Sequence, residues 1–207
     1  MRNSKLVLIG IGLLLMGALV ISLYSGKVQA ASIVGSPHDL SGSGWGTNQI
    51  CIFCHTPHNA KTEASAPLWN HGDTTATYTL YSSPTFTATS IDQPGSNSKA
   101  CLSCHDGTVA VDTYGSRTGS NFMSGDALLD INLANDHPIS FVYDGALAAA
   151  DGGLYIPQSS SQVVPGIPLF YGKMECASCH GVHDNANGNF LRFNNAGSAL
   201  CLKCHNK

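Results

Sequence analysis

Charged side chains are scarce in this 207-residue chain, which has ten Lys and Arg, 13 Asp and Glu, and only 11% charged residues in all. A protein that binds nucleic acid needs clusters of Lys and Arg to neutralise the phosphates. This composition therefore argues against nucleic acid as a partner. So low a charge is also unusual for a soluble monomer, and it indicates that a large apolar group or other subunits cover part of the surface.

Cysteine is absent outside one recurring motif. All eight cysteines belong to four copies of Cys-x-x-Cys-His, at residues 51–55, 101–105, 176–180 and 201–205, so none is left over for a structural disulfide. Cys-x-x-Cys-His is the attachment motif of c-type haem, in which both cysteines form thioether bonds with the porphyrin and the histidine binds the iron from one side. One helical turn separates these residues, which brings both sulfurs to the same porphyrin edge.

The motifs thus predict four covalently bound haem c groups. We assign the thioether bonds to the motif cysteines, Cys51, Cys54, Cys101, Cys104, Cys176, Cys179, Cys201 and Cys204. We assign the proximal iron bonds to the motif histidines, His55, His105, His180 and His205. Zinc sites also use Cys-x-x-Cys pairs, but zinc chemistry does not require a histidine after each pair. A thioredoxin-like redox motif usually occurs once, near a βαβ pattern, and no such pattern is found in this sequence.

Residues 1–30 have the pattern of a signal peptide. Arg2 and Lys5 precede a long uncharged apolar run, and residues 28–30 (Val-Gln-Ala) form a small-residue cleavage site. Left uncleaved, the run is long enough to span a membrane, but the cleavage site favours removal. Export also agrees with haem c, which is attached outside the cytoplasm. We therefore expect an extracellular or cell-surface protein, or alternatively a periplasmic one, whose residues 31–207 form a single domain.

Removal of residues 1–30 leaves seven of the ten basic residues and all 13 acidic ones. The exported part therefore carries a formal charge of about −6. Four haems in about 177 residues would supply much of the core themselves. With 22 Gly and 9 Pro, the sequence predicts mostly coil, short helices at the haem motifs and a few short strands, as in a multihaem cytochrome c with a haem-packed core. We expect an extended arm at 31–50, one or two strands or a strap at 74–90, and a short helix at 146–150.

The motifs form two couples, at 51–105 and 176–205, and five further histidines can supply the second axial ligands. These candidate distal ligands are His38, His58, His71, His137 and His183. Five candidates for four irons make bis-histidine ligation possible throughout, with Met123 as a weaker alternative at one site. Because His58 and His183 follow a proximal histidine by three residues, they cannot easily reach the far face of their own haem. We expect each to bind the other haem of its couple.

With these residues in hand, the sequence resembles the multihaem c-type cytochromes, and within them the secreted tetrahaem cytochromes of the OmcE type, which polymerise into conductive filaments. The resemblance spans nearly all of 31–207. It rests on matching segments at 38–40, 51–60, 67–71, 135–138, 176–183 and 190–192. It implies a coil-rich fold, bis-histidine haems in a continuous row, and one axial histidine donated between subunits, a role that we carry to His38.

Three functions are compatible with these features. The first is an extracellular electron conduit, in which copies of the chain join head to tail as a filament. The second is a monomeric periplasmic electron shuttle with the same four haems. The third is a multihaem reductase. It is disfavoured because an enzyme needs an open position on the iron, and the histidines outside the motifs are enough to fill the second axial position of every iron. We therefore expect no catalytic residues, and the motifs do not identify the redox partners.

Overall fold

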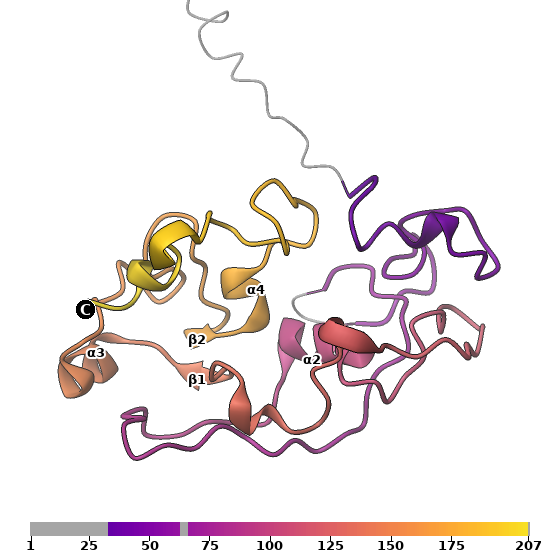
Figure 1. Cartoon of the computed structure of the whole chain (residues 1–207). Coiled ribbons are helices and arrows are strands. Elements are labelled where there is room, and N and C mark those ends of the chain that lie inside the picture. Colours follow the sequence, from indigo (N-terminus) through magenta and orange to yellow (C-terminus); the bar gives the residue numbers. More distant parts are fainter. Residues whose placement is uncertain (1–32, 63–65, 207) are drawn as a thin grey trace, which may run out of the picture. The chain divides into compact units, whose positions relative to one another are not determined.

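The computed structural model describes residues 33–62 and 66–206, so the predicted signal peptide lies outside the described residues. Most of the described chain is coil and turn, joined by short elements (Figure 1). The helices are α2 (Ser96–His105), α3 (Gly145–Asp151) and α4 (Cys176–Cys179), and the strands are β1 (Phe141–Val142) and β2 (Lys173–Met174). Single 3-10 turns occur at Leu40–Gly42, Gly125–Ala127, Leu133–Asn135, Ala196–Ser198 and Cys201–Lys203. No helix in the described ranges is long and apolar enough to cross a membrane.

Helix α2 begins after Gly95 and carries the second haem motif in its last turns. Asp106 follows the helix and is buried, and its carboxylate accepts hydrogen bonds from the hydroxyls of Thr74 and Tyr78, each at 2.6 Å. These bonds attach the segment at 74–78 to the end of the helix. Helix α2 is therefore held in place by polar contacts as well as by its fully buried Leu102.

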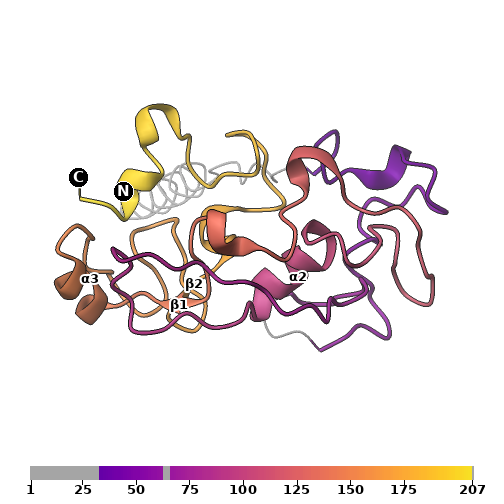
Figure 2. The same cartoon turned by 60° about the horizontal axis from the view of Figure 1, so that its bottom comes forward.

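Strands β1 and β2 pair antiparallel, with Phe141 opposite Met174. In both views the pair lies between α3 and α2 (Figures 1 and 2). One apolar cluster gathers around it, formed by Phe141, Tyr143, Leu147, Val163, Ile167, Leu169, Met174 and Leu200. The region between the second and third motifs thus has a conventional side-chain core, which the composition alone did not predict.

Helix α3 confirms the short helix expected at 146–150. Asp144 caps it, because its carboxylate accepts a hydrogen bond from the backbone N–H of Leu147 at 2.8 Å. The helix ends at Gly152, whose φ of 69° lies in the left-handed region that glycine adopts readily.

The segment at 74–90 contains no strand, so the strand alternative for it was wrong and the strap alternative holds. Thr79 is the one residue of this segment that makes backbone-to-backbone hydrogen bonds with another segment, to Ile131 and Leu133. Ser83 and Thr85 instead bond to each other beside Pro84. Proline and local hydroxyl bonds compete with a strand ladder, which explains the outcome.

Candidate haem-binding site

Each Cys-x-x-Cys-His motif forms a single helical turn. The backbone N–H of the motif histidine bonds to the carbonyl of the first cysteine at 2.8 Å in the first motif, 3.1 Å in the third and 3.0 Å in the fourth. The second motif lies inside α2. All eight cysteines are free thiols in the structure. One turn places the two sulfurs of a motif on one side of the backbone, as attachment to a single porphyrin edge requires.

Three of the four motif histidines are oriented by backbone carbonyls. The Nδ1 atoms of His55, His105 and His180 lie 2.7–2.8 Å from the carbonyl oxygens of Pro67, Ala127 and Asn189, respectively. A carbonyl only accepts, so Nδ1 carries the proton in each case and the Nε2 lone pair is left for a metal. Metal-binding histidines are held in this way, which fixes the tautomer and the ring orientation.

Three of the four motif histidines face a second histidine ring. Two imidazoles that bind one metal ion from opposite sides, each through a bond of about 2 Å, have ring centres about 6 Å apart. The observed pairs are His55 with His183 at 6.0 Å, His105 with His38 at 6.0 Å, and His205 with His137 at 6.3 Å. No group of three or more His, Cys, Asp or Glu suited to a metal occurs in residues 33–62 and 66–206. The paired donor set fits haem iron with two axial histidines.

Two of these pairs differ from the sequence-based expectations. His183 faces His55 of the first couple, although we expected it to serve the fourth motif of its own couple. His38 faces His105 of its own chain, which does not agree with a role on a neighbouring subunit. The arm at 33–50 folds back by turns and stacks His38 on Phe190, with ring centres 4.3 Å apart. Sequence spacing along one helix could not show either contact, because both join distant segments.

His38 lies where several motif histidines converge. Burial, together with the nearby His105, His183 and His180, lowers the pKa of His38 to about 4. His105 belongs to the second motif and His180 to the third, and His183 follows the third motif by three residues. The binding sites of the first three motifs therefore meet in one region, because His183 also faces His55.

His180 is the motif histidine that faces no other histidine ring within the described part of the chain. Two candidate distal ligands remain, His58 and His71. His58 is exposed on the loop after the first motif. His71 is 1% exposed, and its Nδ1 and Nε2 lie 2.7 Å and 3.2 Å from the carbonyl oxygens of Gly72 and Ala110. Burial lowers the pKa of His71, so a neutral ring held by its own chain is favoured at this position.

The cysteines of successive motifs lie near one another. Burial and then the nearby Cys54 raise the pKa of Cys104, which links the first motif to the second. A hydrogen bond with Cys176 raises the pKa of Cys101, which links the second motif to the third. Burial and then Cys179 raise the pKa of Cys204, which links the third motif to the fourth. The attachment points therefore follow one another in space in the order of the sequence.

The environment of the site includes residues that the motif analysis did not identify. Phe190 stacks on His38, and Arg192 donates from Nε to the carbonyl of Ala177 in the third motif at 2.8 Å. Burial lowers the pKa of this guanidinium. The carbonyls that orient the motif histidines were also missed, because a backbone oxygen has no sequence signature.

Comparison with known families agrees with the C-terminal part of this site. The family described as "Doubled CXXCH motif" matches residues 170–207, which contain the third and fourth motifs. No curated protein matches the chain. The match indicates a c-type haem-binding region like those of multihaem cytochromes. It supports haem binding and electron transfer for the part of the chain that contains the third and fourth motifs.

Proposed function

We propose that this protein transfers electrons through four covalently bound, bis-histidine haems c. The observation that carries the proposal is the set of three histidine pairs at 6.0–6.3 Å, each of which joins a motif histidine to a distal one. Haem iron would supply reversible one-electron chemistry at these positions. Carbonyl bonds orient the imidazoles of His55, His105 and His180, and at three of the four motifs a second histidine lies close to the motif histidine. With histidines for both axial positions at these three sites, electron transfer is favoured over catalysis there.

The chain also brings the four sites close together, which electron transfer between them requires. His183 follows His180 by three residues, yet the two belong to different sites, because His183 faces His55. The first and third sites therefore share one short segment of backbone. The contact between Cys101 and Cys176 joins the second and third attachment points. We infer that the four sites form one continuous group.

The histidines that have no opposing histidine within the described chain support a filament. His180 lacks a facing histidine within the described chain, and His58 is an exposed histidine without a motif histidine opposite it. We propose that His58, and not His38, reaches the iron site at His180 of the next copy. Such an interface uses two different surfaces, so it does not close on itself and generates a head-to-tail filament.

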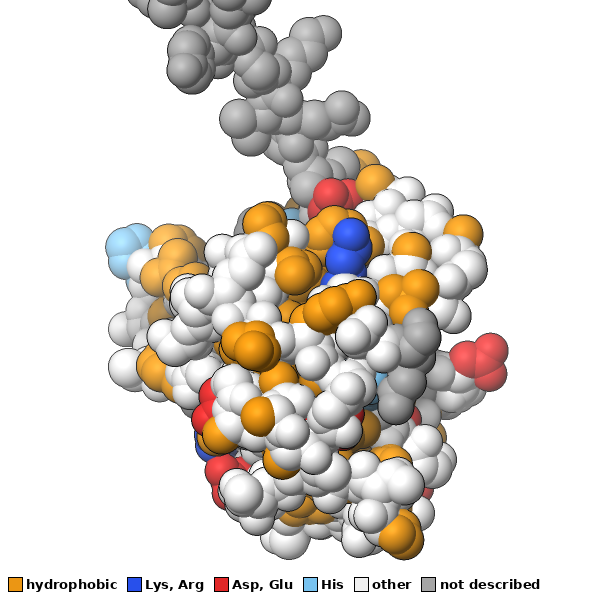
Figure 3. Space-filling view, turned by 90° about the vertical axis from the view of Figure 1, so that its left-hand side faces the viewer, with side chains coloured by type: hydrophobic (Ala, Val, Ile, Leu, Met, Phe, Trp, Pro, Cys, Tyr) orange, Lys and Arg blue, Asp and Glu red, His pale blue; other side chains and the backbone are white. Residues whose placement is uncertain are grey.

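The surface agrees with burial between copies. Charged side chains are sparse on the face drawn in Figure 3, where apolar side chains are spread among the backbone and other uncharged side chains. Several large apolar residues are at least 37% exposed, among them Val34, Phe122, Ile131, Ile156, Tyr171 and Leu202. We propose export to the cell exterior for this filament, and a monomeric periplasmic shuttle is the second candidate because the same internal sites would serve it.

The test compares the exported protein with His58→Ala and with Thr62→Ala, an exposed control on the same loop. Mass spectrometry counts the haems, electron paramagnetic resonance separates low-spin from high-spin iron, and negative-stain microscopy detects filaments. We expect four low-spin haems and filaments in the wild type and in Thr62→Ala. His58→Ala should give single particles with one high-spin haem.

Other outcomes are equally decisive. A wild type without covalent haem overturns the electron-transfer proposal. Single wild-type particles with four low-spin haems identify the shuttle. Filaments that persist unchanged in His58→Ala overturn the role of His58.

A further inference from the structure

Glu175 is a buried carboxyl group between two haem attachment points. It lies between β2 and α4, directly before Cys176, and is 3% exposed. Helix α2, with Cys101 of the second motif, packs against α4. Cys101 and Cys176 lie close enough for each thiol to shift the pKa of the other. Glu175 is therefore placed where the second and third motifs meet, and α4 separates it along the chain from the iron-binding His180.

Two hydroxyl groups hold this carboxyl. Ser98 of α2 and Ser140, which precedes β1, both donate to Glu175 Oε2, the latter at 2.9 Å. A serine hydroxyl donates to a carboxylate and, after rotation, accepts from a protonated carboxyl. The cluster formed by Glu175, Ser98 and Ser140 can thus hold the carboxyl in either protonation state. Ser98 Oγ also accepts from the backbone N–H of Cys176 at 3.0 Å, which connects the cluster to the third attachment point.

The charges around the cluster nearly cancel. Lys173 of β2 and Asp92, from the segment before α2, are the charged groups that act on Glu175, and they form an ion pair of 2.6 Å with each other. The side chains that face Glu175 from α2 and from the start of β1 are the uncharged Ser98 and Ser140. Burial is therefore the largest influence, and it raises the pKa of Glu175.

Protons have a route to the cluster. A cavity of about 160 Å³ reaches it and is lined by Gln93, Gly95, Ser140, Phe170, Tyr171, Lys173 and Glu175. This volume holds several water molecules, and its lining supplies polar partners for them. Ser140 and Glu175 belong to both the cluster and the cavity wall.

We propose that Glu175 is a proton-binding site coupled to the electron occupancy of the haems attached at Cys101 and Cys176. This inference rests on the proposed function. A haem held at Cys101 or Cys176 would gain one negative charge when it accepts an electron from a neighbouring reduced haem. Glu175 would then take up one proton from bulk solvent through the water of the cavity and change from carboxylate to carboxylic acid, so the net charge would be restored. In a buried region the new negative charge favours the protonated form strongly.

The test is potentiometry of the haem-loaded protein as a function of pH, for the wild type, Glu175→Gln and Asp130→Asn. Asp130→Asn removes one carboxylate at an exposed position and serves as the control. For one or two of the four haems we expect the wild-type midpoint to fall as pH rises. The fall approaches 59 mV per pH unit, which is the value for a tenfold change in a one-electron equilibrium. Glu175→Gln should abolish this slope and Asp130→Asn should keep it.

Ser140→Ala provides a second variant that keeps the carboxyl. It removes one donor to the carboxylate, so we expect the same slope over a range shifted to higher pH. Redox-induced infrared difference spectra should show a protonated carboxyl band on reduction of the wild type, and that band should be missing in Glu175→Gln.

A pH slope and a carboxyl band that survive in Glu175→Gln overturn the inference. Haem content and low-spin spectra are measured on the same samples. Loss of haem in the wild type would be a failure of the proposed function, whereas four low-spin haems with unchanged pH slopes would be a failure of the Glu175 inference alone.

Discussion

The imidazole rings of His55 and His183 face each other with their centres 6.0 Å apart, although the two histidines belong to different motif couples. His183 is fixed to the third motif, because His180 is only three residues before it. One short segment therefore serves two sites. This relationship makes the first site dependent on the C-terminal part of the chain, and it has a direct experimental consequence.

Replacement of His183 by alanine should affect the first site and leave the fourth intact. We expect one of four haems to become high-spin, with the potentials of the remaining haems changed less. Electron paramagnetic resonance measures the spin state, and proteolysis followed by mass spectrometry of haem peptides confirms full loading. A high-spin haem at the fourth motif instead would mean that His183 serves its own couple and that the observed pairing is wrong.

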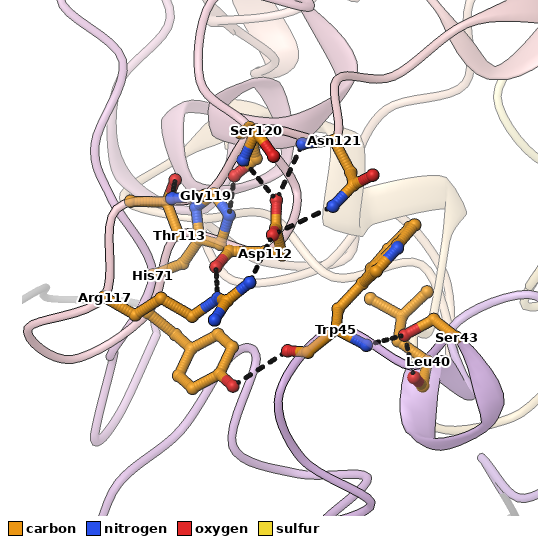
Figure 4. Close-up of polar contacts among 12 residues, drawn as sticks. Leu40, Ser43, Trp45, His71, Asp112, Thr113, Arg117, Gly119, Ser120 and Asn121 are labelled. Carbon is orange, nitrogen blue, oxygen red and sulfur yellow. Dashed lines mark hydrogen bonds and ion pairs between the residues drawn. The ribbon is translucent and has the colours of Figure 1, made fainter.

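Asp112 should stabilise the protein in a pH-dependent way. It is fully buried and accepts hydrogen bonds from Arg117, Ser120 and Asn121, all of which point toward it in Figure 4. Burial raises its pKa, but these bonds outweigh burial and hold the pKa at about 2. Because the folded pKa lies below the unfolded value, this stabilisation is present above about pH 4 and is lost as pH falls toward 2.

We expect Asp112→Asn to lower the free energy of unfolding by about 2 kcal/mol at pH 7 and to flatten its dependence on pH below 4. Urea unfolding at several pH values measures both effects. Asp92→Asn, which breaks an ion pair between partly exposed side chains, is the control and should cost less than about 1 kcal/mol. An equal loss in both variants would contradict the structural role of Asp112.

Gly119 lies so close to Asp112 that it has no room for a side chain. A Cβ at this position would be 2.2 Å from Asp112 Oδ1 and 2.6 Å from the backbone carbon of Asp112. Gly119→Ala should therefore displace the loop and destabilise the protein by about 1–3 kcal/mol. Gly42→Ala is the control, since its added Cβ meets nothing within 4 Å. Thermal unfolding compares the two variants, and equal midpoints would show that the loop yields without cost.

The apolar cluster around β1 and β2 should contribute to stability independently of the haems. Ile167 is 1% exposed within this cluster, whereas Ile156 is 71% exposed. Ile167→Ala should cost about 2–5 kcal/mol and Ile156→Ala less than about 1 kcal/mol. Denaturant unfolding of loaded protein tests this, and a small effect at both positions would mean that the haems alone form the effective core.

Local patterns predicted the local features well. The helix at 146–150 follows from a capping Asp144 and a terminating Gly152, both of which act through neighbouring backbone groups. The strap at 74–90 was ambiguous, because β-favouring residues and prolines in that segment favour different structures. The apolar cluster around Phe141 was missed, since its members come from several short segments with no periodic pattern of their own.

The sequence by itself identifies the four Cys-x-x-Cys-His motifs as the expected attachment sites. Cysteine and histidine spacing is a property of one helical turn, so Cys51, Cys54 and His55 specify their site without any distant contact. Which distal histidine faces which motif was decided only by the tertiary structure. His38, His137 and His183 each meet a histidine from another segment, and such meetings depend on how turns and short elements bring segments together. Spacing along the chain contains no information on that packing, which is why the pairing could be obtained only from the folded protein.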